Sequence, residues 1–240
     1  MLFFLPVILL LLVNLPTAYA QDLSLKAYFF PYASLFEAKV YQYMNEDDPN
    51  DIIYQFTQTH IHQGDTLFTL RNYDTYFQEL ESKVQRISTA GVYLQKYSLY
   101  IAGQGISSKV IQEEVYKWKA SKTTPFKWAV RYSSPYGEES FRKMRQAIKK
   151  TKPRSFQQKK YPTIQFRDDF RHSIKHRKGA TTNDFFQYSY YAQGLGLIAY
   201  DRTLSSGKKL RYRLTKIMDL NSWQTLLKRP QQPLIPIKRT

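Results

Sequence analysis

The stretch that most constrains the fold of this chain is FFQYSYYAQGLGLIAYD, residues 185–201. Tyr188 and Tyr190 alternate with polar residues, which is the two-residue period of a strand with one apolar face. Gly194 and Gly196 follow, two residues apart, where glycine permits a bulge or the close approach of a neighbouring segment. We therefore predict a bent strand, or two strands meeting, in an antiparallel sheet, with Gly194 and Gly196 as structural glycines.

The same alternation recurs along the chain, with turn signals every ten or so residues between the segments. The clearest segments cover residues 35–44, 52–57, 66–73, 92–101, 126–131, 162–172 and 209–214. Strands in this sequential order are typical of a β-meander. A last short helix is expected to carry Trp223, Leu226 and Leu227, with Asn221 or Ser222 as its cap.

Two segments have patterns that fit both a helix and a strand. In residues 74–91, Phe77, Leu80, Val84 and Ile87 have helical spacing, but the segment joins two strong strands. In residues 138–150, Phe141, Met144 and Ile148 could form one face of a basic helix. A lysine-rich edge strand explains the second segment equally well. Residues 149–160 and 171–183 are polar, so we predict an exposed loop and a long mobile loop there.

The first twenty residues have the composition of an export signal. Residues 2–13 are almost wholly apolar, and Ala18-Tyr19-Ala20 supplies small residues for cleavage before Gln21. The apolar run is shorter than the ~20 residues of a membrane-spanning helix. The chain contains no cysteine, so no disulfide framework and no lipid-acceptor cysteine are expected. We predict a signal peptide over 1–20, one β-rich domain over 21–229, a flexible tail over 230–240, and a location in the periplasm or cell envelope.

Positive charge is concentrated in the second half of the chain. Residues 21–115 carry 7 basic and 12 acidic side chains, whereas residues 116–240 carry 29 basic and 7 acidic ones. Such asymmetry indicates a polyanionic partner, and export disfavours nucleic acid. Alternation places Lys209, Arg211 and Arg213 on one face of a strand, so these three are the candidate anion-binding residues.

The sequence offers few candidate catalytic residues. Asp168, Asp169 and His172 form the best acid–base cluster, although Arg167 and nearby basic residues are the expected ion-pair partners of the carboxylates. His60 and His62 share a strand face, but no third ligand follows at a recognisable metal-binding spacing. Neither a phosphate-binding loop nor a nucleophile elbow is present in the sequence. We expect no metal and no cofactor.

A resemblance to a known group of proteins rests on four segments: FEAKVYQY, FKWAVRYSSPYG, YPTIQFRDDF and YYAQGLGLIAYDR. The chain resembles functionally uncharacterised exported β-sheet proteins of Gram-negative bacteria and, more distantly, the curved sheets of periplasmic lipoprotein carriers. The resemblance implies a long antiparallel sheet curved around a core or groove. It also implies that residues 74–91 and 141–148 are strands.

These observations predict a mainly β protein with a single curved, open antiparallel sheet, half-barrel-like, and a short C-terminal helix. Aromatic residues make up 16% of the chain, and tyrosine suits a groove that holds apolar tails beside polar groups. The candidate apolar groove consists of Phe166, Phe170, Tyr188, Tyr190 and Tyr212. The expected function is non-catalytic binding of an amphipathic or anionic envelope component, such as an anionic lipid or an envelope glycan. The alternatives are a structural protein that docks an acidic partner and a hydrolase that uses Asp168 or Asp169.

Overall fold

The computed structural model describes residues 23–31, 34–120, 125–177 and 179–228. The predicted signal segment, residues 1–20, and the predicted tail, residues 230–240, lie outside the described residues. The main sheet comprises β2 (Lys39–Asn45), β3 (Ile52–His62), β4 (Asp65–Tyr73), β5 (Glu79–Ile87), β6 (Gly91–Ile101), β7 (Gln104–Ser107), β8 (Lys109–Lys117), β10 (Phe126–Ser134), β11 (Gly137–Phe156), β12 (Lys159–His176), β13 (Gly179–Ala192), β14 (Gly196–Thr203) and β15 (Lys209–Asp219). The short strands β1 (Leu23–Ser24) and β9 (Lys119–Ala120) pair separately.

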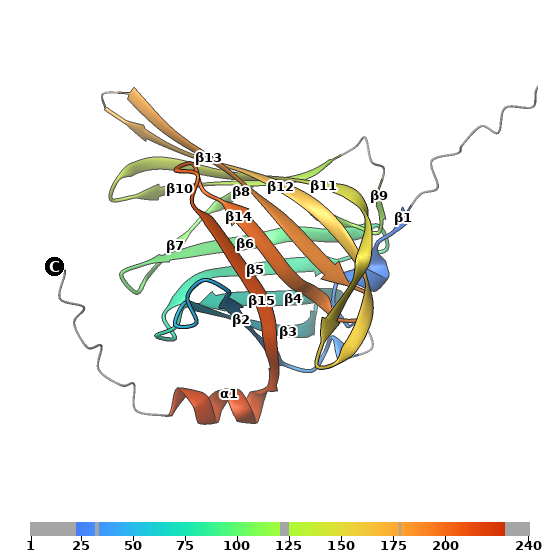
Figure 1. Ribbon diagram of the computed structural model, residues 1–240. Coiled ribbons are helices and arrows are strands. Elements are labelled where there is room, and N and C mark those ends of the chain that lie inside the picture. Colours follow the sequence, from blue (N-terminus) through green and yellow to red (C-terminus); the bar gives the residue numbers. More distant parts are fainter. Residues whose placement is uncertain (1–22, 32–33, 121–124, 178, 229–240) are drawn as a thin grey trace, which may run out of the picture.

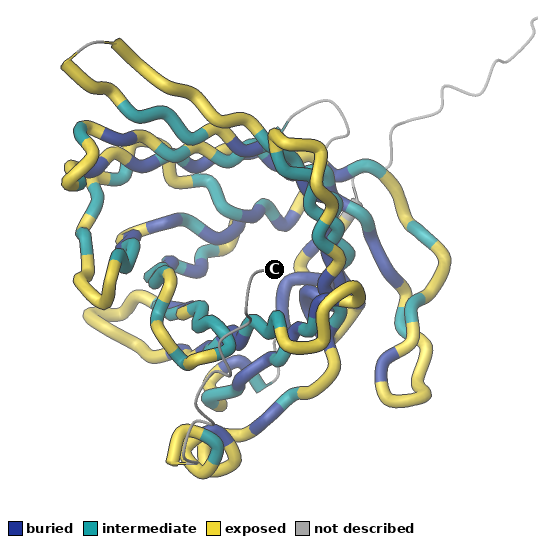
Figure 2. Tube along the Cα trace, turned by 60° about the vertical axis from the view of Figure 1, so that its left-hand side comes forward, coloured by how far each residue is buried: buried dark blue, intermediate teal, exposed yellow. Residues whose placement is uncertain are grey.

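The main sheet closes on itself. In the described part of the chain, twelve strands form a barrel in which each strand pairs antiparallel with the next one along the ring (Figures 1 and 2). The ring is closed by β15 and β2, whose register runs from Tyr212 opposite Asn45 to Asp219 opposite Lys39. The mainly β class is confirmed, but the prediction of an open curved sheet is wrong. Closure removes the two exposed edges that an open sheet would present to other chains.

Both ambiguous segments, residues 74–91 and 138–150, contain strands and no helix, as the resemblance implied, although in the first only residues 79–87 and Gly91 are strand. Residues 79–87 form β5, and residues 138–150 lie within β11. In β5 the inward positions are held by Glu81, Lys83 and Gln85, which line the barrel interior. Polar residues therefore occupy the inward positions of β5, where apolar residues are usually found. As a result, β5 lacks the alternation of apolar and polar residues that identifies a strand.

The two predicted loops are strands as well. Residues 149–160 form the paired arms and turn of the β11–β12 hairpin, and residues 171–176 and 179–183 belong to the turn-side part of the β12–β13 hairpin. The loop predictions are wrong because the side chains on both arms of each hairpin are largely exposed to solvent near the turn. Exposure gives the arms a loop-like composition, although their backbones pair as far as Phe156 opposite Lys159 and His176 opposite Gly179.

One end of the barrel is filled by residues 25–31, which we call the plug segment. This segment includes the 3-10 turn η1 (Lys26–Tyr28), and Leu25, Phe29 and Phe30 are buried in the main core. The Phe29 ring packs edge-on against Phe68 at 5.4 Å between ring centroids. In Figure 1 the plug segment lies at the right-hand end of the barrel. The barrel interior is thus closed by aromatic side chains at this end.

The predicted C-terminal helix is present as α1 (Leu220–Leu227). Its cap is Asp219, whose side chain accepts a 2.7 Å hydrogen bond from the Ser222 backbone N–H, so the predicted caps Asn221 and Ser222 lie inside the helix. Trp223 is buried and packs against Tyr54 at 5.3 Å between ring centroids on the outside of the barrel. Among the described residues, no helix has the length and apolar character needed to cross a membrane.

Candidate functional site

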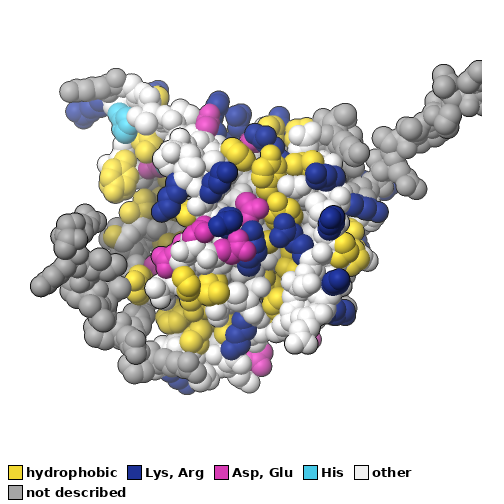
Figure 3. Space-filling view, in the orientation of Figure 1, with side chains coloured by type: hydrophobic (Ala, Val, Ile, Leu, Met, Phe, Trp, Pro, Cys, Tyr) yellow, Lys and Arg dark blue, Asp and Glu magenta, His cyan; other side chains and the backbone are white. Residues whose placement is uncertain are grey.

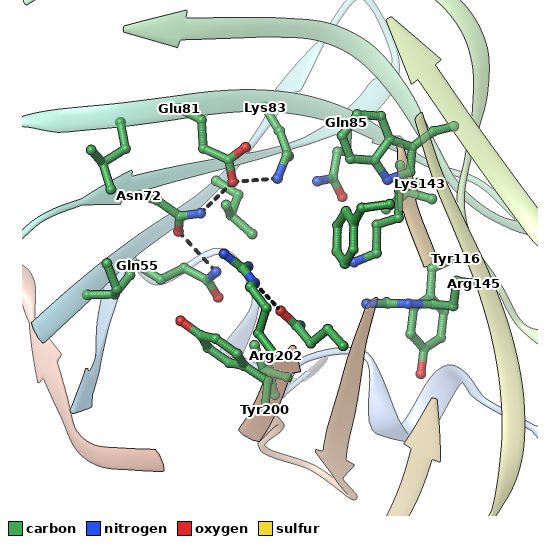
Figure 4. Close-up of a pocket in the computed structure, with 18 of the residues that line it drawn as sticks. Gln55, Asn72, Glu81, Lys83, Gln85, Tyr116, Lys143, Arg145, Tyr200 and Arg202 are labelled. Carbon is green, nitrogen blue, oxygen red and sulfur yellow. Dashed lines mark hydrogen bonds and ion pairs between the residues drawn. The ribbon is translucent and has the colours of Figure 1, made fainter. Parts of the chain in front are cut away.

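A cavity of about 380 Å³ lies inside the barrel, between the plug segment and the opposite end. Its apolar lining includes Phe30, Leu99, Trp128, Phe141, Phe170 and Phe185. Its polar lining includes Gln55, Asn72, Glu81, Lys83, Gln85, Lys143, Arg145, Gln187 and Arg202 (Figure 4). An interior with both kinds of side chain suits a ligand that itself has an apolar part and a polar part.

The first polar group of the cavity is a chain of hydrogen bonds on β3, β4 and β5. Glu81 Oε1 accepts from Lys83 Nζ at 2.6 Å and from Asn72 Nδ2 at 2.6 Å, and Asn72 Oδ1 accepts from Gln55 Nε2 at 3.1 Å. Burial on its own would raise the pKa of Glu81, but the charge of Lys83 and these hydrogen bonds hold it below its usual value. Glu81 is therefore ionised and acts only as a hydrogen-bond acceptor.

The second polar group is centred on Asp168 of β12, a fully buried carboxylate. Arg145 donates to both of its oxygens, at 2.6 and 2.9 Å, and Lys143 Nζ lies 3.2 Å from Oδ2. The Ser189 hydroxyl adds a 2.6 Å hydrogen bond. Burial favours a raised pKa, but Arg145 and Lys143 outweigh it and hold the pKa of Asp168 well below its usual range.

This second group extends to Arg202 of β14 near the opposite end of the barrel. Gln187 Nε2 donates to Ser189 Oγ at 2.8 Å, and Gln187 Oε1 accepts from Arg202 Nε at 3.0 Å. Arg202 forms no ion pair with a described carboxylate, and its guanidinium lies over the ring of Phe185 at 5.5 Å from the centroid. Its charge is thus available to a bound anion.

Lys143 has an unusual environment for a lysine. Burial and the neighbouring charge of Arg145 lower its pKa to about 7, although Asp168 opposes the shift. Its Nζ lies over the face of Phe170 at 5.0 Å from the centroid. Lys83, Arg145 and Arg202, joined by Lys143 when it is protonated, therefore share this interior with two carboxylates, and the excess of positive charge favours anions over cations.

The predicted anion-binding row on β15 lies on the outer surface. Arg211 pairs with Asp47 at 2.5 Å, and Arg213 pairs with Glu46 at 3.0 Å and with Asp201 at 2.6 Å. Lys209 is exposed. The acidic turn between β2 and β3 thus neutralises much of this row, and an anion would have to compete with these carboxylates.

The five aromatic residues predicted to form one groove lie on both faces of the sheet. Phe166, Phe170 and Tyr212 are buried on the inner face, whereas Tyr188 and Tyr190 are half-buried on the outer face. On β13 the inward positions belong to Gln187, Ser189 and Tyr191, so the sequence analysis assigned the wrong face of this strand to the core. Ser189 faces inward, where its hydroxyl donates a hydrogen bond to the buried carboxylate of Asp168. Alternation along the strand then places its neighbours Tyr188 and Tyr190 on the outer face.

The residues considered for hydrolysis do not form one site. Asp168 faces inward, whereas Asp169 is half-exposed and pairs with Arg167 at 3.0 Å between the guanidinium and carboxylate. His172 lies instead beside Glu139, with 2.5 Å between Nε2 and Oε2. His60 and His62 are exposed, and the described residues hold no group of three potential metal ligands.

The two predicted structural glycines both have positive φ, +71° for Gly194 and +89° for Gly196. The Gly194 N–H donates a 2.7 Å hydrogen bond to the Ala27 carbonyl in the plug segment. A Cβ atom on Gly196 would lie 2.7 Å from the Phe29 carbonyl oxygen. This turn is therefore where the plug segment docks against the barrel.

Most of the cavity residues have no recognisable signal in the sequence. Gln55, Lys83 and Gln85 look like ordinary polar positions of exposed strand faces. Their inward direction follows from barrel closure, which no local pattern reveals. A signal for part of the site was present at Phe141, Lys143 and Arg145, whose two-residue spacing places two cations on the same strand face as an aromatic residue.

No protein-family model matches this chain, and no curated protein matches it. Among solved structures, it is similar to a putative lipoprotein from Parabacteroides distasonis ATCC 8503, with 10% sequence identity, a TM-score of 0.50, and coverage of 80% of this chain and 98% of that one. A putative exported protein with a YmcC-like fold from Bacteroides fragilis NCTC 9343 matches at 10% identity and a TM-score of 0.49, over 80% of this chain and 99% of that one. At this identity, the first similarity shows a shared fold.

Proposed function

We propose that this chain is an exported cell-envelope protein that binds an amphipathic anion inside its barrel without converting it chemically. The observation that carries the proposal is the composition of the cavity, in which cations and aromatic rings line one continuous space. The volume of about 380 Å³ falls within the ~300–1,000 Å³ of typical small-molecule sites. The signal-like composition of residues 1–20 supports the cellular location.

A fluorescent fatty acid, 11-(dansylamino)undecanoic acid, tests the proposal by titration, with its uncharged methyl ester as the comparison. Arg202→Gln is the informative variant, because removing a cation without an acidic partner leaves no carboxylate unpaired. We expect the acid to bind about tenfold more weakly to Arg202→Gln than to the parent, with little change for the ester. Arg171→Gln, the same change at an exposed ion pair with Asp184, should leave both affinities unchanged. Equal affinity of the parent for acid and ester would contradict the proposal.

A second function, docking to an anionic membrane surface, is favoured by the outer face of the β11–β12 hairpin. From Ser140 to Arg167 the chain has ten basic residues and no acidic one. Five lysines near the turn are exposed and form no salt bridge with any described residue: Lys149, Lys150, Lys152, Lys159 and Lys160. Figure 3 shows dark-blue basic side chains along the right-hand side of the molecule, where Figure 1 places this hairpin.

The hairpin holds these lysines on a defined scaffold. Phe156 at the turn is buried in the main core, and the Arg154 guanidinium lies over Tyr190 at 3.7 Å from the ring centroid. The cations are thus presented together and lose less conformational entropy on docking than they would on a free loop. The sequence analysis placed the docking of an anionic partner on β15. The hairpin suits such docking better, because its lysines form no salt bridge with described residues, whereas Arg211 and Arg213 of β15 do.

Cosedimentation with phosphatidylglycerol–phosphatidylcholine vesicles tests the docking function. A variant with all five hairpin lysines changed to Gln should lose most of its binding, and the parent should release the vesicles as salt is raised. The control variant carries Lys209→Gln, Arg211→Gln and Arg213→Gln, and it should bind like the parent because carboxylates already neutralise Arg211 and Arg213. If the hairpin variant binds as well as the parent, its lysines are only a solvated surface.

A further inference from the structure

We propose that the ligand of the cavity carries a hydroxyl group next to its anionic group, because the cavity presents an unpartnered acceptor together with an available cation. The acceptor is Gln55 Oε1, and the cation is Arg202. This inference rests on the proposed function and specifies the head group that the cavity selects.

The orientation of the Gln55 amide is fixed by Glu81. An ionised carboxylate only accepts hydrogen bonds, so Asn72 must direct its NH₂ group toward Glu81. The Asn72 carbonyl oxygen therefore faces Gln55, which must donate with its own NH₂ group. This leaves Gln55 Oε1 as an acceptor that no described residue satisfies.

This unpartnered oxygen is buried, since Gln55 is only 8% exposed. A buried carbonyl oxygen without a donor destabilises the protein, so a donor from elsewhere is expected. Gln85, 3% exposed and also on the cavity lining, has a second amide oxygen that accepts no hydrogen bond from any described residue. A ligand with only an anionic group could satisfy neither oxygen once it is fully ionised, because an ionised carboxylate or a phosphate dianion has no hydrogen to donate.

Arg202 is oriented by a second series of hydrogen bonds, which begins at Asp168. The carboxylate fixes the Ser189 hydroxyl as its donor, Ser189 Oγ then accepts from Gln187, and the Gln187 carbonyl accepts from Arg202 Nε. This series uses one of the five N–H groups of the guanidinium. The terminal nitrogens remain for a carboxylate or phosphate, which the planar guanidinium can bind with two parallel hydrogen bonds.

The two series of hydrogen bonds thus end in complementary groups that line the same cavity, as Figure 4 shows for Gln55 and Arg202. The first presents an acceptor and the second a cationic donor. A head group with a hydroxyl beside a carboxylate or phosphate matches both, and its apolar tail would contact the aromatic lining.

The test compares two pairs of ligands by isothermal titration calorimetry. Dodecanoic acid and 2-hydroxydodecanoic acid differ by one hydroxyl beside the carboxylate. 3-(Dodecyloxy)propyl phosphate and 1-O-dodecylglycerol 3-phosphate also differ by one hydroxyl, here close to a phosphate. We expect the hydroxylated member of at least one pair to bind about tenfold more tightly, and that pair identifies the anion. Equal affinities within both pairs would overturn the inference and mean that water satisfies Gln55. If none of the four ligands binds, the proposed function fails together with the inference.

The variant Gln55→Leu separates the hydroxyl contact from the rest of the site. It should abolish the preference for the hydroxylated ligand, measured as the ratio of the two affinities within the variant. Gln165→Leu, the same change on the outer face of β12, should keep the preference. A preference that persists in Gln55→Leu would overturn the assignment of this residue, and the comparison within the parent stands even if the variant folds poorly.

Discussion

Asp168→Asn is expected to lower the free energy of unfolding by about 3–5 kcal/mol, because it leaves Arg145 and Lys143 buried without their carboxylate. Asp168 is 0% exposed, so water does not replace the lost partner. Urea denaturation followed by circular dichroism measures the change. The matched control is Asp169→Asn, one residue along the strand on the outer face, where loss of the exposed pair with Arg167 should cost less than about 1 kcal/mol. Equal losses for the two variants would contradict the buried network.

The cost of Asp168→Asn should also depend on pH. The pKa of Asp168 is lowered in the folded protein by Arg145 and Lys143 against the opposing effect of burial, so its contribution to stability is fully present above the unfolded pKa of about 3.9. The contribution is lost as the pH falls below that value toward the folded pKa. The difference in stability between the parent and Asp168→Asn should therefore shrink in acid. A difference that stays constant down to acid unfolding would show that Asp168 is not a paired carboxylate.

Gly196→Val is expected to lower the free energy of unfolding by about 2–6 kcal/mol, the sum of backbone strain at positive φ and overpacking against the plug segment. A Cβ atom there would approach the Phe29 carbonyl oxygen to 2.7 Å and the Phe30 ring to 3.0 Å. Gly64→Val is the matched control, because Gly64 has φ +85° but nothing within 4 Å of its added Cβ. It should show only the strain, about 1–3 kcal/mol. Similar losses for both variants would mean that the plug segment does not dock at Gly196.

The sequence predicts strands well wherever one face is apolar. Tyr212 and Leu214 alternate with exposed cations on β15, and the alternation reports a buried inner face. The closure of the barrel was not predictable in this way. The pairing of β15 with β2 joins Asp219 to Lys39, and nothing in either segment distinguishes an interior strand of an open sheet from one that closes a barrel.

The candidate site was harder to predict than the fold, because its residues break the rule that the interior is apolar. Lys83 and Gln85 face inward on β5, so the strand has no apolar alternation and could be taken for a helix. On β13, the inward Ser189 satisfies Asp168, and the outward Tyr190 stacks with Arg154. A periodic pattern in the sequence shows which residues are polar. Here the inward residues of these strands are polar because they lie beside the buried carboxylates, so a polar residue does not indicate a solvent-exposed position.

The most direct test of the central claim is to locate the bound amphiphile by photolabelling. The protein is irradiated with a dodecanoic acid that carries a diazirine in its tail, and the labelled residues are identified by peptide mass spectrometry. We predict labels on residues that line the cavity, such as Leu99, Phe141 and Phe185, and their suppression by excess unlabelled dodecanoic acid. Labels confined to outward-facing residues such as Tyr188 and Tyr190, or labels that excess ligand does not suppress, would contradict binding inside the barrel.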